Sequence, residues 1–176
     1  KFWKKKENLL GYSINSLEVF FASINEPKFR AKQVLKWIHQ KGIIDFSQMT
    51  DLNKLLREKL ESIACIIPPE VEEIHSSPEG TKKYLIKLSS GSMVEMVKIP
   101  EKKRMTLCIS SQAGCALQCT FCATGAQGFE KNLTADEIIG QVWLANFHED
   151  DITPITNVVF MGMGEPLLNF NPVIES

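Results

Sequence analysis

The chain has 176 residues, of which 44% are hydrophobic and 23% charged, and its formal net charge is −1. This length and apolar content are sufficient for one ordinary domain or two small ones with a buried core. No apolar run approaches the roughly 20 residues that span a bilayer, and no apolar signal segment follows the basic start. We therefore expect a soluble, cytoplasmic protein that has no membrane partner.

The charge is distributed unevenly along the chain. Residues 1–110 contain 19 Lys and Arg against 13 Asp and Glu, whereas residues 111–176 contain one Lys against eight Asp and Glu. A basic first part is suited to binding a polyanion such as RNA, but an ordinary solvated surface is equally typical of such lysines. Because the chain starts with Lys1 and stops within a pattern, we also expect it to be a fragment of a longer protein.

The first part of the chain has the pattern of a small helical domain. Apolar residues at helical spacing predict three helices, at residues 16–24, 28–41 and 51–64. Ser16 is the predicted cap of the first helix, and Thr50 or Asp51 that of the third. The second helix has one apolar and one basic face, which fits either an RNA-facing helix or a core helix with a lysine-rich exterior. Cys65, which follows in an apolar run, is predicted to be buried packing.

Short alternating segments follow the linker Pro68-Pro69. They predict four antiparallel strands, at residues 71–76, 82–88, 92–99 and 105–110. In the third of these strands, Glu95 shares the more apolar face with Met93, Val97 and Ile99. A carboxylate on such a face is typical either of a sheet edge or of a functional site.

The last part of the chain is predicted to form a βαβ unit. The capping box of Thr134 and Glu137 opens a helix that extends to about Phe147. The run 157–161 is predicted to be a parallel strand buried on both faces, and it leads directly into the sequence GMGEP at 162–166. Ligands of such folds bind beyond the carboxyl ends of the strands. The loop after residue 110 and the GMGEP loop are therefore expected at the same edge of the sheet.

Three cysteines occur within eight residues, in the sequence GCALQCTFCATG: Cys115, Cys119 and Cys122. Three thiolates at this spacing are suited to one iron–sulfur cluster that keeps an open iron. Zinc normally takes four ligands, and the nearest fourth is Cys108 on a predicted strand. A three-thiolate [4Fe-4S] cluster, a zinc site and chance clustering are the alternatives. An odd total of five cysteines argues against a secreted disulfide framework.

The cysteine spacing, with Phe121 before the last cysteine, resembles the signature of the radical S-adenosylmethionine (SAM) enzymes. Gly164-Glu165-Pro166 resembles their Gly-Glu-Pro motif. The segments that narrow the resemblance to the bacterial radical SAM adenine-C2 methyltransferases of 23S rRNA and tRNA are FRAKQVLKWI, VEMVKIP, CISSQAGCALQCTFCATGAQGF, EIIGQVW and PITNVVFMGMGEPLLN. The resemblance covers nearly the whole chain from about residue 15.

This resemblance implies an α/β fold in three parts. They are a helical RNA-binding domain at 1–67, an antiparallel strand connector at 68–104, and the first part of a partial radical SAM barrel at 105–176. It also implies two cofactors, a [4Fe-4S] cluster and SAM, and an electron donor such as flavodoxin. In that family, one SAM methylates a cysteine, and a radical from a second SAM activates the methyl group for addition to adenine C2.

The resemblance also implies roles for individual residues. The expected cluster ligands are Cys115, Cys119 and Cys122, and the expected cofactor contacts are Phe121, Gly164 and Glu165. Cys108 matches the cysteine that resolves the protein–RNA crosslink through a transient disulfide bond. Glu95 matches the proposed general base that removes the C2 proton, for which an apolar strand face is favourable.

One feature of the family has no counterpart, because no residue here matches the methyl-carrying cysteine. Cys65 matches no motif, so we expect the 176-residue chain alone to be inactive in RNA methylation. Two alternatives stay open. They are the related C8-adenine rRNA methyltransferase that confers antibiotic resistance and a non-catalytic, metal-bearing RNA-binding module. We expect the protein to be a monomer whose partners are 23S rRNA and tRNA.

Overall fold

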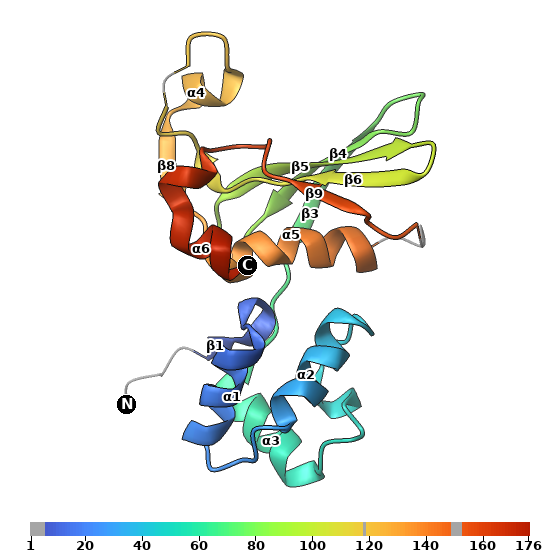
Figure 1. The fold of residues 1–176 in the computed structure, drawn as a ribbon, viewed down its shortest axis with the longest axis vertical. Helices are drawn as coiled ribbons and strands as arrows, with labels where there is room; N and C mark the ends of the chain where they lie inside the picture. The colour runs from blue at the N-terminus through green and yellow to red at the C-terminus, as the bar shows by residue number, and fades with distance from the viewer. Residues whose placement is uncertain (1–5, 118, 149–152) are drawn as a thin grey trace. The chain divides into compact units, whose positions relative to one another are not determined.

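The computed structural model describes residues 6–117, 119–148 and 153–176 and divides into two compact units, Lys1–Ile67 and Pro68–Ser176 (Figure 1). The first unit is mainly helical, and the second is built around a sheet, so the predicted α/β class is confirmed. Among the described residues, no helix is both long and apolar enough to cross a membrane.

The first unit contains three ten-residue helices: α1 (Ile14–Ser23), α2 (Arg30–His39) and α3 (Lys54–Ile63). Two short 3₁₀ turns, η1 (Leu9–Gly11) and η2 (Phe46–Gln48), and a parallel pair of two-residue strands, β1 (Glu7–Asn8) and β2 (Ala64–Cys65), complete it. Each helix buries one apolar stripe in a common core, whose fully buried side chains include Leu17, Phe21, Val34, Ile38, Leu56 and Leu60.

The predicted caps of the first and third helices are wrong. Helix α1 begins two residues before Ser16, because the Ser13 hydroxyl accepts the hydrogen bond from the Ser16 backbone N–H at 3.2 Å. Asn53 caps α3 by accepting from the backbone N–H of Leu56 at 2.8 Å. Asp51 instead accepts from the Trp37 indole N–H at 2.6 Å, which ties α2 to the segment before α3.

The predicted burial of Cys65 is also wrong. Cys65 is only half-buried in β2, where its thiol lies 3.6 Å from the backbone carbonyl of Glu7. Cys65 has this position because β2 pairs with β1. The sequence pattern predicts neither of these two short strands.

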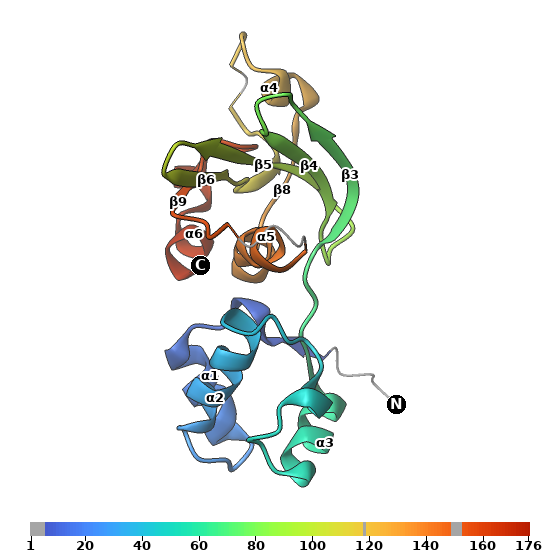
Figure 2. The ribbon, with the colours of Figure 1, turned by 90° about the vertical axis from the view of Figure 1, so that its right-hand side faces the viewer.

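The second unit contains a five-stranded sheet with the order β3-β4-β5-β6-β9. Its strands are β3 (Glu70–Ser76), β4 (Lys82–Lys87), β5 (Met93–Glu101), β6 (Arg104–Cys108) and β9 (Asn157–Val159). The first four strands are antiparallel neighbours, whereas β6 and β9 are parallel. Helix α5 (Ala135–Phe147) connects this parallel pair and lies along one face of the sheet (Figures 1 and 2). The predicted βαβ unit is therefore present.

The face of the sheet against α5 is the buried one. Its core joins side chains of the sheet to those of the helix, including Tyr84, Ile86, Val94, Met96, Leu107, Ile138 and Leu144. Glu95 lies on the opposite face, where residues are only half-buried. The more apolar face of the strand, which carries Glu95, is therefore not the better-buried one, because α5 covers the face of Val94 and Met96.

The predicted burial of the last strand on both faces is wrong too. Val158 is 44% exposed and Val159 is half-buried. Strand β9 is the last strand of the sheet in the part of the chain that the structure describes, so it has a neighbour on one side only.

Two further strands were not predicted. Strands β7 (Gln112–Gly114) and β8 (Phe129–Asn132) pair antiparallel, and the cysteine loop and the short helix α4 (Ala123–Gln127) connect them. After β9, the chain forms the 3₁₀ turn η3 (Pro166–Asn169) and the helix α6 (Phe170–Glu175).

The predicted capping box of α5 is present and includes a buried ion pair. Glu137 accepts from the backbone N–H of Thr134 at 3.0 Å and from the Lys131 ammonium at 2.9 and 3.0 Å. Burial alone would raise the pKa of Glu137. Hydrogen bonds from Lys131, Ser90 and Thr134 outweigh it and hold that pKa below its ordinary value. The start of α5 is thus fixed to the end of the β7–β8 pair.

Candidate active site

The parallel pairing of β6 with β9 brings two loops to one edge of the sheet. Strand β6 ends at Cys108, and the next residue, Ile109, donates its backbone N–H to the Val159 carbonyl at 2.9 Å. The backbone N–H of Gly162 then donates to the Ile109 carbonyl at 3.1 Å. The GMGEP loop therefore lies beside the segment that leads into the cysteine loop.

Further hydrogen bonds fix the GMGEP loop on residues 110–112. Met163 donates its N–H to the Ser110 hydroxyl at 2.9 Å, and its carbonyl accepts from the Ser111 N–H at 2.9 Å. The Glu165 N–H donates to the side-chain oxygen of Gln112 at 3.0 Å. Three consecutive residues of one loop thus hold the backbone of the other.

Only glycine fits at two positions of the GMGEP loop. Gly164 has a φ of +93°, and a Cβ there would lie 2.4 Å from the Cβ of Gln112. A Cβ at Gly162 would lie 2.7 Å from the carbonyl oxygen of Ile109. Both distances are below any real contact, so the close approach of the two loops requires the two glycines.

Two buried side-chain amides also hold the backbone of residues 110 and 111. Gln141 of α5 is fully buried, accepts from the Ser110 N–H and donates to the Ser110 carbonyl, both at 2.9 Å. Asn169 donates to the Ser111 carbonyl at 2.8 Å and to the Leu133 carbonyl at 2.7 Å. Sequence analysis missed both residues. For Gln141, the sequence did carry a signal, which is an amide within the apolar helical pattern EIIGQVW.

The three clustered cysteines differ in exposure. Cys115 is buried at the end of β7, where its N–H donates to the Gly128 carbonyl at 3.0 Å, while Cys119 is exposed and Cys122 is half-buried. The backbone N–H groups of Gly125 and Thr124 lower the pKa of the Cys122 thiol, which favours the thiolate that binds metals. Cys119 and Cys122 line an open hollow together with Gly125 and Gly128.

The donor set fits an iron–sulfur cluster in kind, because three thiols and no other metal-binding side chains occur in the loop. Among the residues that the structure describes, no three His, Cys, Asp or Glu side chains lie close enough together to hold a metal ion.

One observation on the docked segment also fits a bound ligand. The Ser111 hydroxyl is buried and has no hydrogen-bond partner among the described residues. A buried polar atom without a partner is costly, so such atoms mark places where a ligand or water binds. Ser111 lies between the two residues whose side chains hold the GMGEP loop.

The two remaining predicted cofactor contacts are accessible. Phe121 is 91% exposed in the cysteine loop. The Glu165 carboxylate accepts from the Leu167 N–H at 3.1 Å and thereby caps η3. The structure thus places Gly164 and Glu165 together at the edge, with Phe121 on the neighbouring loop, and their roles stay predictions.

The two predicted catalytic residues share the half-buried face of the sheet. Cys108 on β6 lies opposite Val97 on β5, and Glu95 is two residues from Val97 on the same strand. Such diagonal neighbours lie about 7–8 Å apart, within reach of long side chains. Glu95 forms an ion pair with Lys83, whose ammonium nitrogen is 3.0 Å from the Oε1 atom of Glu95.

Burial raises the pKa of the Cys108 thiol above its ordinary value, and a hydrogen bond with the backbone of Met161 offsets this only in part. The thiol is therefore held in its protonated, less reactive form at neutral pH.

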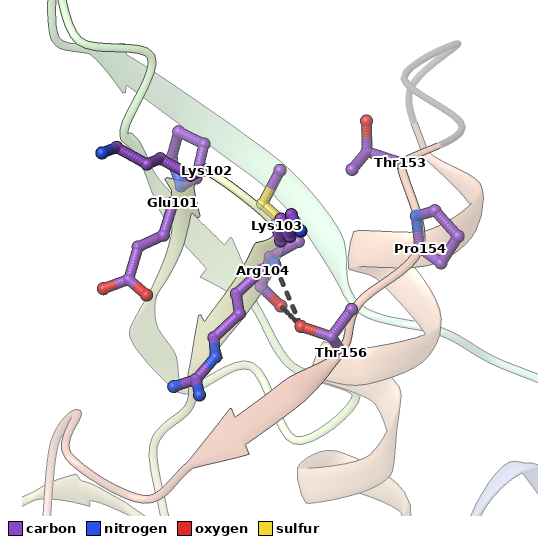
Figure 3. Close-up of a pocket in the computed structure, with 9 residues that line it drawn as sticks. Glu101, Lys102, Lys103, Arg104, Thr153, Pro154 and Thr156 are labelled. Atoms are coloured by element: carbon purple, nitrogen blue, oxygen red, sulfur yellow. Dashed lines mark hydrogen bonds between the residues drawn. The ribbon is translucent and has the colours of Figure 1, made fainter.

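A different pocket lies at the opposite ends of the strands. It is formed where β5 turns into β6 and where the chain enters β9, and its lining includes Lys103, Arg104, Thr153 and Pro154 (Figure 3). Thr156 closes it through the hydrogen bond from the Met105 N–H to its hydroxyl, 3.0 Å long. Because Arg104 begins β6 and Cys108 ends it, the pocket contains none of the predicted site residues.

Comparisons with known proteins agree with this architecture. Residues 7–66 match the family described as the ribosomal RNA large subunit methyltransferase N-terminal domain. A crystal structure of a radical SAM methyltransferase from Sphaerobacter thermophilus superimposes with a TM-score of 0.87 and 34% identity, covering 96% of this chain and 50% of that one. The fold therefore matches part of the fold of a radical SAM methyltransferase.

Curated relatives narrow the family further. A dual-specificity RNA methyltransferase RlmN from Pseudomonas putida is 58% identical over 97% of this chain, and one from Marinobacter nauticus is 53% identical over 98%. The chain spans 46% and 48% of these two relatives, which is less than half their length. The chain is thus a relative of the dual-specificity RNA methyltransferases RlmN, and the resemblance predicted from the sequence is confirmed.

Replacing Gly164 by Ala should destabilise the second unit more than replacing Gly91 by Ala. Both glycines have a φ near +90°, but a Cβ at Gly91 meets nothing within 4 Å. The Gly91 variant therefore reports only the backbone strain, about 1–2 kcal/mol, and the Gly164 variant adds the collision with Gln112. Urea unfolding measures the difference. Equal losses for the two variants would contradict tight docking of the GMGEP loop.

Cys108 should react with iodoacetamide at a higher pH in the folded chain than in the unfolded chain. Its raised pKa delays formation of the thiolate as the pH rises. Mass spectrometry can follow alkylation of this site across the pH range, with the urea-denatured chain as the control. Limited access lowers the rate at every pH without moving the midpoint. A folded-state midpoint at or below the denatured one would contradict the burial effect.

Proposed function

We propose that this chain is part of a radical SAM methyltransferase that adds a methyl group to C2 of adenine in 23S rRNA and tRNA. The observation that carries the proposal is the docking of the GMGEP loop on residues 110–112, beside the cysteine loop, in a chain 58% identical to a dual-specificity RNA methyltransferase RlmN. Ligands of such folds bind beyond the carboxyl ends of the strands, which is where both loops lie.

Three thiols of this chain would hold the cluster: Cys115, Cys119 and Cys122. Gly164, Glu165 and Phe121 would contact SAM. When bound, the [4Fe-4S] cluster and SAM would supply the radical chemistry that the unreactive C2 carbon of adenine requires. The lowered pKa of Cys122 supports its role as a thiolate ligand.

Two residues on the half-buried face would act on the RNA adduct. The Glu95 carboxylate would accept the proton that leaves adenine C2. The Cys108 thiol would lose its proton and attack the sulfur of the methyl-carrying cysteine. A disulfide bond would form as the S–C bond to the RNA breaks, and the released methylene carbon would take the electron pair and a proton to become the methyl group. That second cysteine has no counterpart in this chain. The protonated state of Cys108 at neutral pH suits a thiol that must stay free until this step.

The first unit would bind the RNA. Lys32, Lys36 and Lys41 are exposed on or just after α2, and their charges are suited to phosphate contacts. Residues 1–67 would be this RNA-binding domain, residues 68–104 the strand connector and residues 105–176 the first part of the barrel. We further propose a cytoplasmic, monomeric enzyme that receives electrons from a donor such as flavodoxin.

Anaerobic reconstitution of the full-length protein with iron and sulfide tests this proposal. We expect a [4Fe-4S] absorption spectrum that changes when SAM is added, and 2-methyladenosine in 23S rRNA or tRNA. Cys119→Ala should lose the cluster and the activity, whereas Cys65→Ala, a change of a thiol outside the loop, should retain both. Only 8-methyladenosine would support the related C8 enzyme. Stoichiometric zinc without any response to SAM would support a binding module.

A further inference from the structure

One side chain on the half-buried face is not accounted for by the proposed function. The Lys83 ammonium lies 3.0 Å from the Glu95 carboxylate and forms both a hydrogen bond and an ion pair with it. Lys83 lies opposite Val97 and Glu95 lies opposite Leu85, so the lysine reaches diagonally from β4 to β5. Lys83 and Glu95 are therefore not directly opposite each other in the sheet, and their contact depends on the direction in which the lysine side chain extends.

The same face brings the pair next to Cys108. Val97 lies opposite Lys83 on one side and opposite Cys108 on the other, which makes these three residues one row across β4, β5 and β6. Glu95 is one step along the face from that row. The carboxylate is thus flanked by a cation on one strand and a thiol on the next.

We propose that Lys83 is a positioning residue for Glu95, an inference that rests on the role of Glu95 as the proton acceptor in the proposed function. The ammonium donates a charge-assisted hydrogen bond to the carboxylate and thereby limits the directions in which that carboxylate points. Without Lys83, the Glu95 carboxylate would be oriented less well.

The other charged groups near this face do not replace Lys83. Lys87 lies on β4 opposite Met93 and is exposed. On β3, His75 lies opposite Lys83, and its Nε2 atom is 3.0 Å from a Glu73 carboxylate oxygen. On β6, Cys108 and Arg104 share this face, and Arg104 lies opposite Glu101, at the far end of β5 from Glu95. Lys83 is the cation at contact distance from Glu95 among the described residues.

Stability does not explain the pair. The side chains of Lys83 and Glu95 are 46% and 44% exposed. Exposed ion pairs contribute at most about 1 kcal/mol to folding. Variants of either residue should therefore fold normally, so a loss of activity can be assigned to the site.

The first test asks whether the pair exists in solution and needs no activity. The cluster-loaded protein is treated briefly with sulfo-NHS-acetate, and acetylation of each lysine is followed by mass spectrometry. We expect Lys83 to react several-fold more slowly than Lys87, and Glu95→Gln to remove most of this difference. Equal rates for both lysines in the unsubstituted protein would overturn the inference.

The second test asks whether Lys83 acts through Glu95. In the full-length enzyme, Lys83→Met should slow methylation about tenfold and Glu95→Gln about a hundredfold. Lys83→Met should have no further effect when combined with Glu95→Gln. Lys83→Arg should restore most of the rate, and the matched variant Lys87→Met should leave it unchanged. The variants should also accumulate RNA crosslinked to protein, because resolution requires proton removal.

The outcomes separate the two ideas. If Lys83→Met slows methylation equally with and without Glu95→Gln, Lys83 does not act through Glu95 and the inference fails. If Glu95→Gln leaves methylation unchanged, the proposed base is wrong, while the acetylation result still decides whether the ion pair forms.

Discussion

The close docking of the GMGEP loop on residues 110–112 is the constraint on which the rest of the second unit depends. The parallel pairing of β6 and β9 brings the two chain segments together, and two glycines allow their backbones to approach. Ser110 and Gln112 are almost fully buried, so their hydrogen bonds to the loop compete little with water. The cysteine loop follows directly after residues 110–112 in the chain, so this contact also fixes where the loop begins.

The two faces of the sheet have different roles. One face packs against α5 and provides the core, while the other places Glu95 and Cys108 as diagonal neighbours. Register alone puts these two side chains on one surface, because residues two apart on a strand share a face. Lys83 lies on this second face as well. Its charge can act there because no helix packs over that face in the described residues. Stability and proposed chemistry therefore depend on different residues of the same strands.

Much of this arrangement could be predicted, and the failures have physical causes. Hydrophobic periodicity identified the three helices, the antiparallel strands and the βαβ unit, because each has several periods of its own pattern. The short strands β7 and β8 have no such pattern, and their pairing depends on contacts distant in sequence. The sequence did not show which face of β5 is buried, because a strand pattern does not say which face a helix covers. The anchors Gln141 and Asn169 depend on buried carbonyls that only the fold brings to them.

The central claim is that the docked loops form one cofactor site. The most direct test is the affinity for SAM of the reconstituted full-length protein, compared with that of Gln112→Leu. This substitution keeps the bulk of a buried side chain but removes the acceptor for the Glu165 N–H. We expect the same cluster content and at least about tenfold weaker SAM binding, the effect of losing roughly 1.4 kcal/mol. Unchanged affinity at equal cluster content would contradict the claim.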